Sequence, residues 1–191
     1  DSPETLNVTL SNATAVNGSV TAADTEDVTI ADVDQDITIS IADTQETISE
    51  EAGGINTFTI SLSETMNAGN TVTVDVNFAT GTDTENADFY TGAEAALQAA
   101  ADATDGVSYS SGTLTFTDTF VGTDLDFSVQ AKDDDETDSP ETLNVTLSNA
   151  TAVNGTATAS DSEDIEITDT DADVTFKVEV ASETDEAGAQ A

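Results

Sequence analysis

Acidic side chains are concentrated between Lys132 and Glu141, where the sequence reads KDDDETDSPE. Carboxylates packed this densely repel one another strongly unless a cation lies among them. Ca²⁺ accepts about six to eight oxygen ligands in irregular loops, whereas Mg²⁺ demands a tight octahedron and keeps its waters. Zn²⁺ and copper are poor fits, because the chain has no His and no Cys. The stretch therefore predicts a calcium site, and the alternative is a solvated acidic loop.

Catalysis finds little support among these residues. No Ser or Thr has a His or Arg partner, since the chain contains neither residue type. A pair of carboxylates could in principle hydrolyse glycosides, but a pair drawn from a cation cluster is a poor general acid. We therefore expect a protein that is not an enzyme.

The whole chain is strongly acidic, with 40 Asp and Glu residues against two Lys and a formal net charge of −38. This charge excludes nucleic acid as a partner, because phosphate binding needs a basic surface. It also disfavours an anionic membrane surface. Moreover, no run of apolar residues is long enough for insertion into a membrane. The absence of Cys leaves stabilisation to packing or to metal.

A long internal repeat organises the chain. Residues 1–18 and 138–155 carry the same eighteen letters, DSPETLNVTLSNATAVNG, and 26 of 34 positions match between 1–34 and 138–171. A repeat of this length indicates a tandem array of whole domains. We expect residues 1–34 to be the C-terminal strands of a preceding repeat, 35–171 to be a complete repeat, and 172–191 to hold the first strand of a following one.

Apolar residues alternate with Thr, Ser, Asn and Asp throughout the complete repeat. This period of two is typical of half-buried antiparallel strands. Seven such segments predict an all-β fold, an immunoglobulin-like Greek-key antiparallel sandwich. The segments are 37–41, 58–62, 72–78, 114–116, 125–129, 143–147 and 165–167.

Residues 93–103, AEAALQAAADA, break this pattern. They contain strong helix formers and no β-branched residue. They predict one short helix, inserted between the third and fourth strands, whose expected role is to cap an open end of the sandwich.

The acidic turn and several other segments resemble Calx-beta domains, which occur in sodium–calcium exchangers, integrin beta-4 and many bacterial surface proteins. The turn reads KDDDETDSPETLNVTLSN, and the resemblance covers most of residues 35–171. The other landmarks are ETISEEAGG at 46–54, the run TVTVDVNFATGTDTENADFY at 71–90, GTLTF at 112–116 and EITDTD at 166–171.

This resemblance implies a set of calcium ligands, carried over position by position. An early Glu, the Asp of a GSDY-like motif, the acidic turn and a terminal Asp cluster contribute. The implied ligands are Glu50, Asp88, Asp133, Asp134, Asp138, Glu141, Asp169 and Asp171, with the backbone carbonyl of Glu136.

Some positions depart from the family pattern. Thr170 stands where the exchanger-type cluster has a third Asp, and Pro140 follows Ser139 where acids are common. Glu50 and Glu51 cannot be separated by sequence, so the number of ions stays open.

The junctions between repeats are short and acidic, ADVDQD at 31–36 and TDTDAD at 168–173. Neither contains Gly, Pro or a Ser-rich stretch, so neither resembles a flexible linker. Their alternating Asp residues lack the Gly and the final Glu of an EF-hand loop. Our hypothesis is that ions at this end of the sandwich tie neighbouring repeats of the same chain together.

The partial repeats contain equivalents of several implied ligands. Asp1, Glu4, Asp32 and Asp34 correspond to Asp138, Glu141, Asp169 and Asp171, without the preceding DDDET. We therefore expect this first site to be incomplete. In the last segment, Glu183, Asp185 and Glu186 echo the early acidic motif.

These expectations favour a calcium-binding structural repeat that rigidifies and extends a bacterial surface adhesin, at the cell surface and outside the cell. The alternative is a self-assembling surface-layer or filament subunit, in which copies of the chain associate through calcium or strand donation. A calcium-sensing regulatory domain is a third reading, but near-identical tandem copies argue against it.

Overall fold

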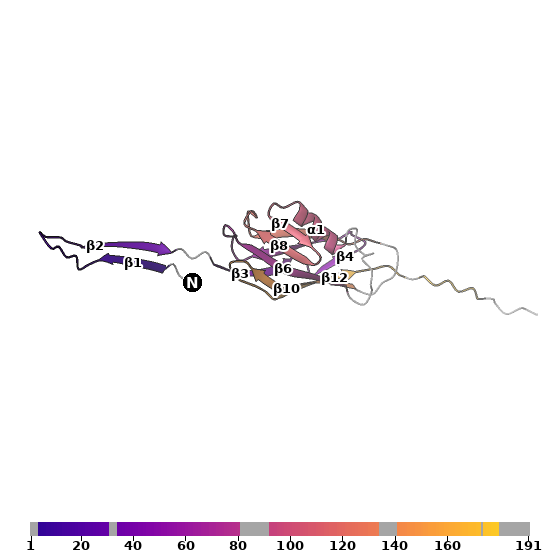
Figure 1. The fold of residues 1–191 in the computed structure, drawn as a ribbon. Helices are drawn as coiled ribbons and strands as arrows, with labels where there is room; N and C mark the ends of the chain where they lie inside the picture. The colour runs from indigo at the N-terminus through magenta and orange to yellow at the C-terminus, as the bar shows by residue number, and fades with distance from the viewer. Residues whose placement is uncertain (1–3, 31–33, 81–91, 134–140, 173, 180–191) are drawn as a thin grey trace, which may run out of the picture.

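The computed structural model describes residues 4–30, 34–80, 92–133, 141–172 and 174–179. Its strands form two sheets that pack face to face, and a separate two-stranded hairpin (Figure 1). The first sheet has the order β4–β12–β10–β6–β8–β7, and the second has the order β11–β3–β5–β9.

The first sheet consists of β4 (Thr47–Ser49), β12 (Asp161–Thr168), β10 (Glu141–Ala152), β6 (Thr71–Thr80), β8 (Thr113–Thr117) and β7 (Val107–Ser110). The second consists of β11 (Gly155–Ala159), β3 (Gln35–Asp43), β5 (Ile55–Leu62) and β9 (Asp124–Gln130).

The connections between the sheets confirm the immunoglobulin-like Greek-key sandwich. Strands β5 and β9 are neighbours in one sheet, and β6 and β10 are neighbours in the other. The chain crosses from β5 to β6, and later from β9 to β10, so the two pairs interlock. All seven predicted strands are present.

The core lies between the sheets and is built from the predicted alternating residues. The long strands of the sandwich bury alternate side chains, as in β9, where Leu125, Phe127 and Val129 are buried. Phe127 stacks on Phe58 with ring centroids 5.1 Å apart, and Phe78 meets it edge-on at 6.1 Å. The first contact lies within one sheet, because Phe58 is on β5 and Phe127 on β9, whereas the second joins the two sheets, because Phe78 is on β6.

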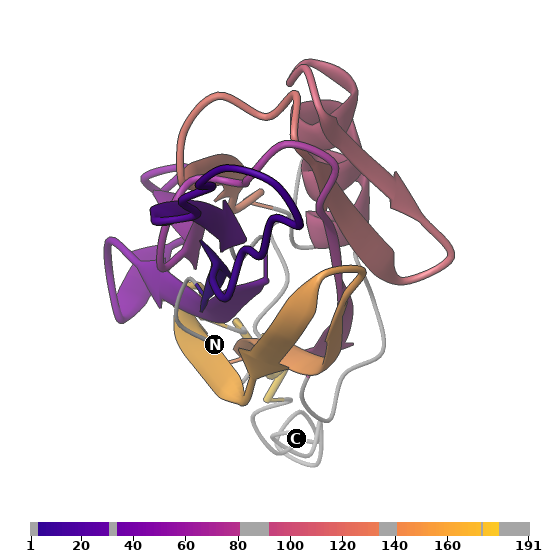
Figure 2. The same cartoon turned by 60° about the vertical axis from the view of Figure 1, so that its left-hand side comes forward.

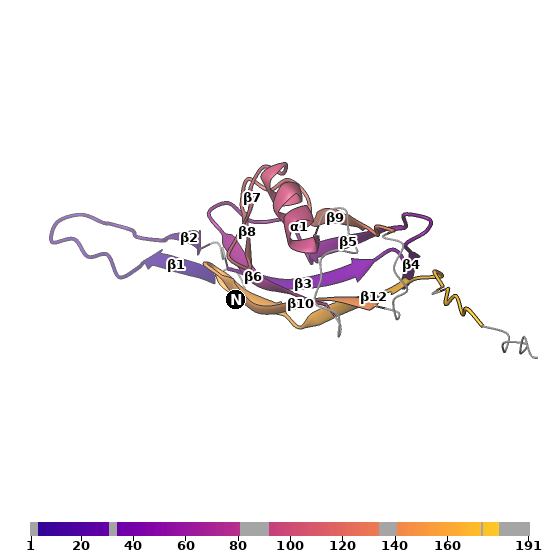
Figure 3. The same ribbon diagram turned by 90° about the vertical axis from the view of Figure 1, so that its right-hand side faces the viewer.

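Helix α1 (Ala93–Asp102) matches the predicted helix and its predicted position in the chain, between β6 and β8, but it does not have the expected role of an end cap. It buries Ala93, Leu97 and Ala101 against β9 and β7, the outermost strands of the two sheets. The helix therefore closes a lateral opening between the sheets and does not cap an end (Figure 3). Viewed closer to the long axis, the segment with α1 and β7 forms one side of the molecule (Figure 2).

Three strands of the sandwich described here lie outside the seven predicted segments. Strand β4 has only three residues and one apolar side chain, Ile48, so no alternation can be recognised. Strand β11 carries small side chains and pairs parallel to β3, and β4 pairs parallel to β12. These two parallel pairs add to the antiparallel pattern. Strand β7, in contrast, does alternate, with Val107 and Tyr109 turned inward.

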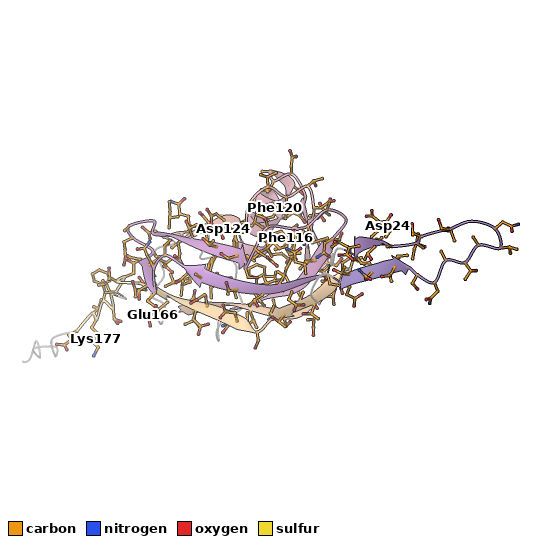
Figure 4. All side chains as sticks on the ribbon, turned by 90° about the vertical axis from the view of Figure 1, so that its left-hand side faces the viewer. Asp24, Phe116, Phe120, Asp124, Glu166 and Lys177 are labelled. Atoms are coloured by element: carbon orange, nitrogen blue, oxygen red, sulfur yellow. The ribbon has the colours of Figure 1, made fainter. Side chains whose placement is uncertain are left out.

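Residues 4–30 form a hairpin of β1 (Glu4–Leu10) and β2 (Asp24–Ile30) that projects from one end of the sandwich (Figure 1). The chain leaves the opposite end after β12 (Figure 3). Residues 174–179, within the predicted first strand of a following repeat, lie outside regular secondary structure. Glu166 and Lys177 lie toward that end, and Asp24 lies on the hairpin at the other (Figure 4).

Candidate metal centre

The candidate metal centre lies where β4 and β12 end side by side. Their parallel register pairs Ile167 with Ile48 and Thr168 with Ser49. The backbone N–H of Glu50 donates to the carbonyl of Thr168 at 3.1 Å. As a result, the residues that follow each strand emerge together at one end of the sandwich.

Three carboxylates meet at this end. One oxygen each of Glu51, Asp169 and Asp171 lies within 4.8 Å of the others. Glu51 is exposed, whereas Asp169 and Asp171 are half-buried. We call these three residues the acidic triad. Such a set of oxygens, without nitrogen or sulfur, fits a hard cation such as Ca²⁺.

Local hydrogen bonds fix the triad in place. The Ser49 hydroxyl donates to Glu51 Oε2 at 2.6 Å, and the backbone N–H of Thr170 donates to Glu51 Oε1. The backbone N–H of Asp171 donates to Asp169 Oδ1 at 2.6 Å. The Thr170 contact joins the turn after β4 to the chain after β12.

The same contacts shift the pKa of Glu51. The hydrogen bond from Ser49, followed by the one from Thr170, lowers its pKa from 4.5 to about 2. Hydrogen bonds to the charged form favour ionisation. Glu51 is therefore an anion throughout the physiological range, which is the state that a cation requires.

Three further predicted ligands belong to the same end. Glu141 begins β10 and pairs with Ile167, two residues before Asp169. Asp133 follows the end of β9. The backbone N–H of Ala131 donates to the carbonyl of Gly54 at 2.9 Å, and this hydrogen bond joins the end of β9 to the turn between β4 and β5. Glu50 lies in that turn and is only 4% exposed.

The other implied ligands lie outside the described residues. These are Asp88, Asp134, Glu136 and Asp138. Asp134, Glu136 and Asp138 fall between Asp133 and Glu141 in the sequence. Of the partial-repeat equivalents, Asp1 and Asp32 are also outside the described residues, and Glu4 and Asp34 are exposed.

The structure separates Glu50 from Glu51, which the sequence alone does not. Ile48 is buried, and Glu50 shares its side of the chain and is buried too. Glu51 points the other way, and its carboxylate belongs to the triad. Side chains alternate between the two sides of the chain from Ile48 to Glu51. Since Ile48 and Glu50 are on the buried side, this alternation places Glu51 on the exposed side.

Repulsion among carboxylates is also evident farther along β12. Partial burial raises the pKa of Glu163, and the nearby carboxylates of Asp43, Asp161, Glu46 and Asp164 raise it further. Each of these four charges opposes ionisation of Glu163. The fold thus pays an electrostatic penalty that bound or surrounding cations would reduce.

No family model matches this chain, and no curated protein matches it. Among solved structures, one described as the apo form of a Calx CBD1 domain is similar, with 16% sequence identity and a TM-score of 0.43. The match covers 70% of this chain and 98% of that one. Among the described residues, no helix has the length and apolar character needed to span a bilayer.

Proposed function

We propose that this chain is a Calx-beta-like repeat that binds Ca²⁺ at the end of its sandwich and serves as a stiff spacer in an extracellular surface protein. The observation that carries the proposal is the acidic triad, which joins Glu51 to Asp169 and Asp171. The sequence placed both Asp residues among the ligands, on family motifs and independently of the fold.

The triad lies where one repeat passes to the next. Asp169 and Asp171 follow β12 directly and open the junction at 168–173. A cation held between them and Glu51 would tie that junction to the turn after β4. Its role is mechanical, because it restricts the direction in which the chain leaves the sandwich.

The shape of the molecule supports the spacer role. The hairpin and the C-terminal segment leave the sandwich at opposite ends (Figure 3). Repeats joined in this way follow one another end to end. We propose neighbouring repeats as the partners, and a bacterial adhesin that holds a distal binding domain away from the cell as the context. No catalytic step is part of this proposal.

Calorimetric titration of the calcium-free chain with CaCl₂ tests the binding. We expect saturable binding that Asp171→Asn weakens by about tenfold or more, because one anionic ligand is lost. Asp102→Asn is the matched control. It removes the same charge from the end of α1, where the carboxylate accepts a bond from the Gln98 side chain at 2.9 Å. Equal weakening by both variants would reduce the effect to net charge and contradict a site at the triad.

A further inference from the structure

Asn is followed by Gly at two places in the chain, Asn17–Gly18 and Asn154–Gly155. This pair is prone to lose ammonia without an enzyme, because Gly has no side chain to shield its backbone nitrogen. Both pairs end the same eighteen residues of the repeat, and both Gly residues have positive φ, 95° at Gly18 and 90° at Gly155. A difference in reactivity between the two pairs would therefore come mainly from their surroundings.

The reaction joins two atoms of the pair itself. The backbone nitrogen of Gly155 attacks Cγ of Asn154, the new N–Cγ bond closes a succinimide ring, and the Cγ–Nδ2 bond breaks. Nδ2 leaves as ammonia and takes up the proton of the Gly155 amide. Water then opens the ring at either of its carbonyls and leaves Asp or isoaspartate. The only co-reactant is solvent water.

The fold holds Asn154 by its backbone and by its side chain. The backbone N–H donates to Asn70 Oδ1 at 3.0 Å, and Nδ2 donates to the carbonyl of Gly69 at 3.2 Å. The carbonyl of Asn154 accepts the backbone N–H of Gln35 at 3.4 Å. Attack requires the side chain to swing onto the Gly155 nitrogen, and the hydrogen bond to Gly69 opposes this movement.

The groups that hold Asn154 are themselves fixed in the sandwich. Asn70 is 2% exposed and Gln35 is 4% exposed, and Asn70 Nδ2 donates to Gln35 Oε1 at 3.2 Å. The same Gln35 oxygen accepts the backbone N–H of Asn67 at 2.9 Å, and Gln35 Nε2 donates to the carbonyl of Thr65 at 2.7 Å. Asn154 thus belongs to a hydrogen-bonded network at the end where β3, β6 and β11 begin. A satisfied buried network of this kind is rigid.

The first pair provides a reference in open solvent within the same chain. Asn17 and Gly18 are both exposed. Among the described residues, a Cβ on Gly18 would meet nothing within 4 Å. We therefore expect Asn17 to react at the rate of an unrestrained Asn–Gly pair.

Either product conflicts with the native contacts of Asn154. A carboxylate in place of the amide turns an oxygen toward the Gly69 carbonyl, so that one acceptor meets another. Isoaspartate carries the chain through the side-chain carbonyl and adds a carbon to the backbone before Gly155. The turn has no room to spare, because a Cβ on Gly155 would already lie 2.1 Å from the carbonyl oxygen of Gln35.

We propose that Asn154–Gly155 is a modification site that the folded sandwich keeps closed. The pair converts to Asp or isoaspartate when the turn between β10 and β11 detaches from β3 and from the turn before β6. The product then prevents the turn from closing again. The pair therefore makes openings of this end of the repeat irreversible, and the repeat weakens there with age. The reaction needs no cation, so it stands apart from the calcium function proposed above.

Peptide mapping of the chain itself tests the site. The chain is held in mildly alkaline buffer, digested with pepsin at acidic pH and analysed by mass spectrometry. Ser19 and Thr156 follow the two Gly residues, so peptides that continue past them differ in mass. We expect Asn154 to react about tenfold or more slowly than Asn17 in the folded chain, and at a similar rate in guanidinium chloride. Equal rates in the folded chain, or the same difference in denaturant, would overturn the proposal.

Two variants separate opening of this turn from unfolding of the whole sandwich. Asn70→Ala removes the acceptor of the Asn154 N–H, so it should speed the reaction at Asn154 by about threefold or more and leave Asn17 unchanged. Asn56→Ala is the matched control. Asn56 is a buried Asn too, but it accepts the backbone N–H of Thr44 at 3.2 Å, beyond the far end of β3. No acceleration by Asn70→Ala, or equal acceleration by both variants, would contradict local opening.

Discussion

Gly155 and Gly18 are the same residue of the repeat in two different surroundings. Both have positive φ, 90° and 95°. A Cβ on Gly155 would lie 2.1 Å from the carbonyl oxygen of Gln35, whereas a Cβ on Gly18 meets nothing within 4 Å. Both turns thus require Gly because of the positive φ. At Gly155 alone, the close approach of the Gln35 backbone also leaves no room for a side chain.

Gly155→Ala should therefore destabilise the sandwich far more than Gly18→Ala. The unfavourable backbone conformation costs about 1–2 kcal/mol, and the clash with Gln35 adds to it. We expect the melting temperature of the sandwich to fall by about 5 °C or more in Gly155→Ala, and to stay nearly unchanged in Gly18→Ala, whose Cβ meets nothing within 4 Å. Equal losses would show that the contact with Gln35 carries little weight.

Glu51 should make the stability depend on pH in a defined window. Its pKa falls from 4.5 to about 2 on folding, first through Ser49 and then through Thr170. A lowered pKa stabilises the fold above the unfolded value and loses this contribution as pH falls through the folded value. The stability difference between the native chain and Glu51→Gln should shrink between pH 4.5 and 2.

Denaturant titrations of both chains in calcium-free buffer measure this difference. Comparison with the variant cancels the protonation of the other carboxylates, which relieves repulsion in both proteins. A difference that stays constant from pH 6 to pH 2 would mean that the bonds from Ser49 and Thr170 do not stabilise the ionised form.

At the scale of single elements, α1 joins the outer strands of the two sheets. Leu97 is completely buried. The helix that carries it contacts both β9 and β7. Leu97→Ala should lower the stability by about 2–5 kcal/mol, because it leaves a cavity. Thermal unfolding measures the loss. Ala95→Ser, on the exposed side of the same helix, is the control and should cost less than about 1 kcal/mol. A Leu97→Ala chain that melts like the control would show that the helix is dispensable to the sandwich.

The sequence predicted the elements whose structure is set by their own side chains. Alternation identified the long strands, because each buries every second residue, and residues 93–103 identified α1 by helix propensity. The short strands escaped where a partner creates them, as β3 does for β11. The duplicated eighteen residues show this directly. The second copy forms a strand as far as Ala152, where it pairs with β6, whereas the strand of the first copy ends at Leu10.

The candidate site was predictable to a similar degree. Family motifs pointed to Asp169 and Asp171, and the structure brings both to Glu51. The position of α1 in the chain was predicted correctly, but its role as an end cap was predicted wrongly, because propensity indicates that a helix forms but not which opening of the sandwich it fills. The sheet order decides that, since β7 and β9 end their sheets on the same side.

At the scale of the whole molecule, a net charge of −38 acts against the compact state. Any salt screens this repulsion, so a gain in stability with CaCl₂ alone does not demonstrate a site. Specific binding differs from screening in its dependence on concentration and ion. It stabilises the folded state by an amount that grows with the logarithm of the free ion concentration above the dissociation constant.

The melting temperature, followed from excess chelator through rising free Ca²⁺, tests the central claim most directly. NaCl at matched ionic strength and MgCl₂ at matched concentration serve as references. We expect a calcium-specific rise, about 2.7 kcal/mol of added stability at a hundred times the dissociation constant, that Asp171→Asn largely removes. A melting temperature that Ca²⁺ raises no more than NaCl at matched ionic strength would contradict the calcium site.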